Sequence, residues 1–68
     1  MRLPKGTLVY IEPKGHMGAT DHAMLETNGN LWIVRDPVEE RGMSLTWCRS
    51  LATDEEHLWY DHEMQAAP

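Results

Sequence analysis

The stretch that decides the fold is HAMLETNGNLWIVR, residues 22–35. At its centre lies the dipeptide Asn28-Gly29, with strand-like runs of residues on both sides. An Asn-Gly pair in this setting is the strongest short-range signal for a β-hairpin, because a type I′ turn requires positive φ angles at both central positions. The stretch therefore predicts a two-residue hairpin in which Leu25 faces Trp32 on the core side.

Further strand-like segments lie on both sides of this stretch. The segment at 7–12, TLVYIE, lies between two PKG turns and predicts a strand, whereas the Pro- and Gly-containing segment at 13–21 predicts a loop. Residues 36–42 predict a turn or a short helical stretch. The segment at 43–51, MSLTWCRSL, alternates with a period of two, which is typical of a half-buried strand.

Two tryptophans are expected to form the centre of the hydrophobic core. Trp32 lies on the core side of the predicted hairpin, and Trp47 lies on the apolar face of the strand at 43–51. The residues expected on that apolar face are Met43, Leu45, Trp47 and Leu51, and Arg49 shares it. The residues expected on the opposite, polar face are Ser44, Thr46, Cys48 and Ser50.

The last quarter of the chain permits two interpretations. Thr53 and Glu56 have the spacing of a capping box, which predicts a short helical turn at 53–56. The segment HLWYDHEM at 57–64 fits an alternating strand better than a helical stripe, so we expect a strand there, with a continuous helix as the alternative. Residues 65–68 are expected to fray.

This layout resembles a small SH3-like barrel of the KOW or Tudor kind. The resemblance rests on the segments GTLVYI, KGHMGATD, MLETNGNLWIV, SLTWC and LATDEE. It implies an all-β fold of five strands, with a central Asn-Gly hairpin and a helical turn before the last strand. The length predicts a single domain over 1–68, with an ordered core at about 6–62. A Tudor-like barrel would also imply an aromatic cage for methylated lysine, for which Tyr10, Trp59 or Tyr60 would have to meet at one end beside an acid.

The charge of the chain is concentrated near its end. The net charge is −5, yet residues 1–50 hold six basic and six acidic side chains, whereas 51–68 hold five acidic side chains and no lysine or arginine. This distribution repels a phosphate backbone and attracts a basic protein surface. A single cysteine, Cys48, favours a reducing cytoplasm, and no segment predicts a signal peptide or a membrane span.

The pattern predicts non-catalytic binding of another protein that has a basic surface. Trp59 is the expected exposed anchor, because aromatic side chains dominate many protein interfaces. The other residues expected at this surface are His57, Asp54, Glu55, Asp61 and Glu63. A second expected patch consists of Met24, Leu31 and Ile33. The small size would suit a phage or mobile-element accessory protein that blocks a host factor, and self-association is a further alternative.

Two other functional classes are the alternatives. A nucleic-acid-binding barrel would use the basic side chains, which are Lys5, Lys14, Arg35, Arg41 and Arg49. A metal-dependent enzyme or metal sensor would use the histidines, but His57 and His62 are five residues apart. That spacing puts them on opposite faces of a strand, or about 140° apart on a helix, so they do not converge on one ion. No cofactor or metal is expected, and Cys48 lacks the neighbouring base that a nucleophile needs.

Overall fold

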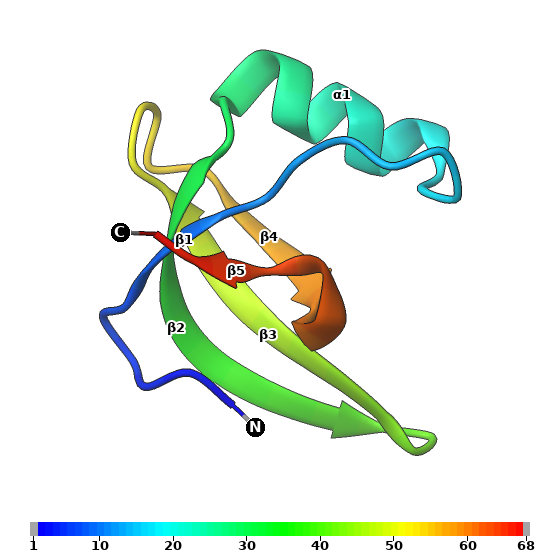
Figure 1. Ribbon diagram of the computed structural model, residues 1–68, viewed down its shortest axis with the longest axis vertical. Helices are drawn as coiled ribbons and strands as arrows, with labels where there is room; N and C mark the ends of the chain where they lie inside the picture. Colours follow the sequence, from blue (N-terminus) through cyan, green and yellow to red (C-terminus); the bar gives the residue numbers. More distant parts are fainter. Residues whose placement is uncertain (1, 68) are drawn as a thin grey trace.

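The computed structural model describes residues 2–67, and its main feature is one open antiparallel sheet of five strands (Figure 1). The order of the strands across the sheet is β4-β3-β2-β1-β5. Their bounds are β1 (Leu8–Tyr10), β2 (Leu31–Glu40), β3 (Met43–Ser50), β4 (Glu56–Tyr60) and β5 (Gln65–Ala66). One helix, α1 (Ala19–Asn28), precedes β2, and a 3₁₀ turn, η1 (Asp61–Glu63), precedes β5. The expected five antiparallel strands are confirmed, but the fold is mainly β and not all-β, because it contains the helix α1.

The predicted hairpin at Asn28-Gly29 is wrong, because the residues before Gly29 form α1. Asn28 is the last residue of the helix, and Gly29 is its C-cap with φ 82°. The Gly29 amide donates to the carbonyl of Leu25 at 2.8 Å. A helix C-terminus and a type I′ turn both favour a glycine with positive φ, so the dipeptide fits either structure. Alanine, methionine, leucine and glutamate at 23–26 favour the helix.

The two-residue hairpin lies instead at Arg41-Gly42, between β2 and β3. Arg41 has φ 52° and Gly42 has φ 76°, and Glu40 pairs with Met43 across the turn. Residues 36–40, which were expected in a turn or helical stretch, therefore belong to the long strand β2. The register shifts between Val34 and Pro37, and such a bulge accommodates a proline that has no N–H to donate.

The C-terminal part of the chain contains more strand than expected. The predicted strand at 57–64 is confirmed only as far as Tyr60, where β4 ends, because η1 occupies Asp61–Glu63; the alternative of a continuous helix is wrong. Gln65 and Ala66 were expected in a frayed tail, but they pair with Tyr10 and Val9 as strand β5. The last residue of the predicted tail, Pro68, lies outside the described residues.

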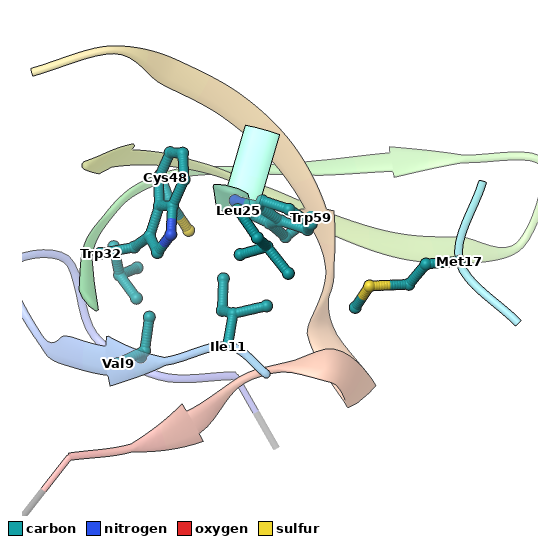
Figure 2. Close-up of a cluster of buried hydrophobic side chains, with 8 residues drawn as sticks. Val9, Ile11, Met17, Leu25, Trp32, Cys48 and Trp59 are labelled. Carbon is teal, nitrogen blue, oxygen red and sulfur yellow. The ribbon is translucent and has the colours of Figure 1, made fainter. Parts of the chain in front are cut away.

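The hydrophobic core lies between the inner face of the sheet and α1, and Figure 2 shows its side chains converging from both elements. Trp32 is fully buried as expected, and its ring meets that of Trp59 edge to face at 5.3 Å between centroids. Leu25 reaches this cluster from α1. The members of the core cluster are Val9, Ile11, Met17, Leu25, Trp32, Val34, Cys48 and Trp59.

The expected orientation of β3 is largely wrong. Thr46, Cys48 and Ser50 are buried, whereas Trp47 is 40% exposed; of the expected apolar face only Leu45 is buried. The polar groups tolerate burial because they find partners, as buried polar groups generally do. The Ser50 hydroxyl donates to the carbonyl of Asn28 at 2.7 Å and so joins β3 to the end of α1.

Candidate protein-binding surface

The outer face of the sheet is the surface opposite the core, and no described element covers its centre. Cross-strand pairing places its residues beside one another: Tyr10 pairs with Leu31, and Trp47 pairs with Leu58. Side chains on one face alternate along each strand. The outer face consists of Leu8 and Tyr10 on β1, Leu31, Ile33 and Arg35 on β2, Trp47 and Arg49 on β3, and Glu56 and Leu58 on β4.

This face exposes several large apolar side chains. Tyr10, Leu31 and Trp47 are 39–40% exposed, and Leu51, in the turn that follows β3, is 55% exposed. The Leu51 amide donates to the carbonyl of Leu31 at 3.0 Å, so these two leucines lie at the same end of the face. Isolated exposed leucines need no explanation, but a contiguous apolar patch with aromatic side chains marks an interaction surface.

A shallow hollow of about 180 Å³ lies at this end of the outer face. It lies between the turn after β3 and the segment that joins α1 to β2. The residues that line it are Asn28, Gly29, Asn30, Leu31, Leu51 and Ala52. Leu31 and Leu51 make it suitable for an apolar side chain from a partner.

The charged groups of the outer face are mainly basic. Arg49 has Ile33 as its neighbour on β2 and Glu56 as its neighbour on β4. Within residues 2–67, neither Arg49 nor Arg35 forms an ion pair within 4.0 Å. The face is therefore locally positive although the net charge of the chain is −5.

The expected exposure of Trp59 is wrong, because its side chain is fully buried. Its ring packs between Trp32 and His57, and the centroid of the His57 ring lies 4.6 Å away in an edge-to-face arrangement. Trp59 follows Leu58 on β4, so it points to the inner face while Leu58 points outward. Sequence alternation alone could not say which of the two faces inward.

Two of the acids expected at the binding surface are engaged within the fold. Asp61 accepts a hydrogen bond from the Thr46 hydroxyl at 2.6 Å, and its second oxygen lies 3.3 Å from Arg2 Nε, an ion-pair distance without hydrogen-bond geometry. Glu63 is only 2% exposed and accepts a hydrogen bond from the Tyr60 amide at 3.0 Å, which closes η1. These carboxylates stabilise the fold and are not free for a partner.

The remaining expected residues are dispersed over the molecule. Asp54 and Glu55 are exposed in the turn between β3 and β4, where Asp54 has φ 66°. His57 is half-buried and lies 2.8 Å from Asp21 on α1. Met24 packs against the core from α1, so it is separated from Leu31 and Ile33, which share the outer face.

The polar side chains considered for metal binding or catalysis are held apart or already paired. Among residues 2–67, no three His, Cys, Asp or Glu side chains are grouped closely enough to hold a metal ion. His16 lies 3.8 Å from Glu63, whereas His57 contacts Asp21. Burial, and to a smaller extent the charge of Asp61, raises the pKa of the Cys48 thiol to about 12, so this thiol stays protonated at neutral pH.

The basic residues of the nucleic-acid alternative do not form one surface. Arg35 and Arg49 lie on the outer face, whereas Lys5 pairs with Asp36 at 3.7 Å. Lys14 lies in the loop before α1, and Arg41 lies at the distant tip of the β2–β3 hairpin (Figure 1). Only the two arginines of the outer face are placed to contact one ligand.

A larger hollow of about 660 Å³ lies beside η1. Arg2, Tyr60, Asp61 and His62 are among the residues that line it. Arg2 is held there by Asp61, by Glu39 at 3.4 Å and by the carbonyl of Val38 at 3.2 Å. The charge of Arg2 and the charges of its acidic partners therefore neutralise each other beside this hollow. The outer face is left as the stronger candidate site.

Sequence reasoning placed Trp47 and Leu51 on the buried face and considered Tyr10 only for an aromatic cage. Tyr10 and Leu8 alternate with Val9 and Ile11, so two apolar faces were visible on β1, but the alternation did not show which one is covered. The unusually apolar outer face of β1 and β2 was the signal that was available.

Comparisons with known proteins identify no relative: no protein-family model, curated protein or solved structure matches the chain. Within residues 2–67, α1 is too short and too polar to cross a membrane.

Proposed function

We propose that this chain is a non-catalytic protein-interaction module that binds its partner through the outer face of the sheet. The observation that carries the proposal is that Tyr10, Leu31 and Trp47 are partly exposed on the same uncovered face. Tryptophan, tyrosine and arginine are the residues most enriched among those that dominate binding energy, and this face has all three. Trp47 takes the anchoring role that was expected of Trp59.

An SH3-like arrangement is part of this proposal. Its support is the layout of the elements: a long connection after β1, the consecutive antiparallel neighbours β2, β3 and β4, and a 3₁₀ turn before β5. The final strand returns to pair with β1, as Figure 1 shows. In this arrangement, the functional surface is supplied by a rigid sheet and not by a reactive pocket.

The test of the proposal uses a photo-crosslinking amino acid at Leu51, on the outer face, in extracts of the cells that encode the protein. The matched control carries the same amino acid at Glu26, which is exposed on α1. We expect a crosslinked protein from position 51 that is absent from position 26 and weakened by Trp47→Ser. Identical products from both positions, or none from position 51, would contradict binding through the outer face.

Single-stranded nucleic acid is the second candidate, and one observation favours it. Trp47 and Tyr10 share the outer face with Arg35 and Arg49, and proteins bind single strands by stacking bases on aromatic rings beside basic groups. Titration of tryptophan fluorescence with a thymidine oligonucleotide at two salt concentrations measures this. Salt-sensitive binding that is lost in Trp47→Ser would favour this candidate over a protein partner.

A further inference from the structure

We infer that the partner presents carboxylates beside apolar side chains, so that the outer face binds an acidic amphipathic segment of another protein. This inference rests on the proposed function, because it names the chemistry of the partner at the same surface. It reverses the expectation of a basic partner, which was drawn from the acidic end of the chain.

The position of Arg49 indicates that the partner carries an opposite charge. Arg49 lies between Ile33 and Glu56 in the middle of the outer face and is already half-buried. Any partner that covers Leu31 and Trp47 also covers this guanidinium. Removing a charged group from water is costly unless an opposite charge pairs with it.

The fold itself does not supply that opposite charge. Glu56 is the acid nearest in the sheet, yet it forms no ion pair with Arg49 within 4.0 Å in the described part of the chain. The partner must therefore bring it. A carboxylate suits the guanidinium, because the two groups can form a pair of parallel hydrogen bonds.

The apolar part of the partner follows from the hollow between Leu31 and Leu51. Its lining is apolar at the two leucines, and Leu31 pairs with Tyr10 across β1 and β2. We expect one apolar side chain of the partner to enter it while neighbouring carboxylates reach Arg49 and Arg35. This combination of apolar and acidic groups defines an acidic amphipathic segment.

A second copy of this chain is a poorer occupant of the same face. It carries the same Arg35 and Arg49, for which residues 2–67 supply no ion-pair partner within 4.0 Å. Bringing two such surfaces together adds repulsion between like charges, which opposes association. An acidic segment supplies the charge that the face lacks.

The experiment is a selection of random 16-residue peptides displayed on phage against the full chain. We expect enriched peptides to carry Asp or Glu next to Leu, Met or aromatic residues. One enriched peptide is then synthesised and its affinity is measured. Trp47→Ser and Arg49→Glu are each expected to weaken its binding at least about tenfold, because each removes one anchoring or charged contact. The control Arg41→Glu makes the same charge change at the hairpin tip and should leave binding unchanged.

Arg35→Glu is the second variant, in case Arg49→Glu lowers the stability of the central strand, and circular dichroism checks that each variant is folded. Enriched peptides that depend on Trp47 but are neutral or basic would overturn the acidic partner and leave the proposed function standing. Enriched peptides that are insensitive to both Trp47→Ser and Leu51→Asp, or no enrichment, would overturn both proposals. A dimer that is found by light scattering and abolished by Leu51→Asp would assign the face to a second copy and overturn the inference. Displacement of the bound peptide by a thymidine oligonucleotide would assign the face to nucleic acid and would overturn it as well.

Discussion

His57 Nε2 lies 2.8 Å from Asp21 Oδ1, and this contact joins β4 to the first turn of α1. Both side chains are largely removed from solvent, and the His57 ring also packs against Trp59. The contact therefore holds the helix over the same end of the sheet that contains the tryptophan pair of the core. The outer face, on the other side of the sheet, is independent of it.

We expect Asp21→Ala to destabilise the protein by about 1–2 kcal/mol. The variant removes the hydrogen bond to His57 and an acid that interacts favourably with the N-terminal end of the helix dipole. Urea denaturation followed by circular dichroism measures the free energy of unfolding. Glu26→Ala, at an exposed position of the same helix, is the control and should change it little. Equal losses in both variants would show that the contact with His57 contributes nothing specific.

Substitution of Trp59 on β4 is expected to lower the stability of the protein far more than substitution of Trp47 on β3. Trp59→Ala should cost about 3–5 kcal/mol, the usual range for a fully buried aromatic residue. A single core in a chain of this size supplies about 3–5 kcal/mol, so the variant should unfold. Trp59→Phe keeps a ring in the core and should remain folded with a lower Tm. Trp47→Ser should fold nearly normally, and a Tm that falls as far as that of Trp59→Phe would contradict the exposed position of Trp47.

The end of α1 is expected to be sensitive to Gly29→Ala. Gly29 has φ 82° and ψ −175°, a region that residues with a Cβ atom essentially avoid, so the variant should lose about 1–3 kcal/mol. Gly15→Ala is the control, because an added Cβ atom has open space at both positions but only Gly29 has a positive φ angle. Thermal unfolding of the two variants measures the difference. The same Tm for both would argue against the helix C-cap and for a different conformation at 28–30.

The stability of the protein is expected to fall at alkaline pH because of Cys48. Its pKa is raised from 9.0 to about 12 in the folded protein, first by burial and then by Asp61. Above pH 9 the unfolded chain loses this proton while the folded protein retains it, so stability present below pH 9 is lost as the pH rises towards 12. The steepest loss is about 1.4 kcal/mol per pH unit.

Urea denaturation at pH 8 and at about pH 10 measures this loss in the wild type and in Cys48→Ala. Other groups that titrate in this range affect both proteins alike, so their difference isolates the thiol. We expect the wild type to lose about 1.4 kcal/mol more than the variant. Alkylation by iodoacetamide should also be slow in the folded protein and fast in urea. Rapid alkylation of the folded protein would contradict the burial of Cys48.

Local patterns were sufficient to predict the strands at 7–12, 43–51 and the start of 57–64, because alternation and residue type act over a few neighbouring positions. They could not assign the positive φ angle signalled by Asn28-Gly29 to a helix end or to a hairpin. Both structures favour a positive φ angle at the glycine, and they are distinguished by the helix-forming residues at 23–26 and by the packing of Leu25 into the core. The true two-residue turn, Arg41-Gly42, has a weaker sequence signal.

The sequence by itself determined the mainly β character of the chain, its net charge of −5 and the burial of Trp32. Only the tertiary structure decided which side of each strand is covered. Alternation divides a strand into two faces, but the side that meets α1 depends on contacts between distant segments, such as Ser50 with the end of the helix. Those contacts bury Trp59 and expose Trp47, so they also decided where the candidate binding surface lies.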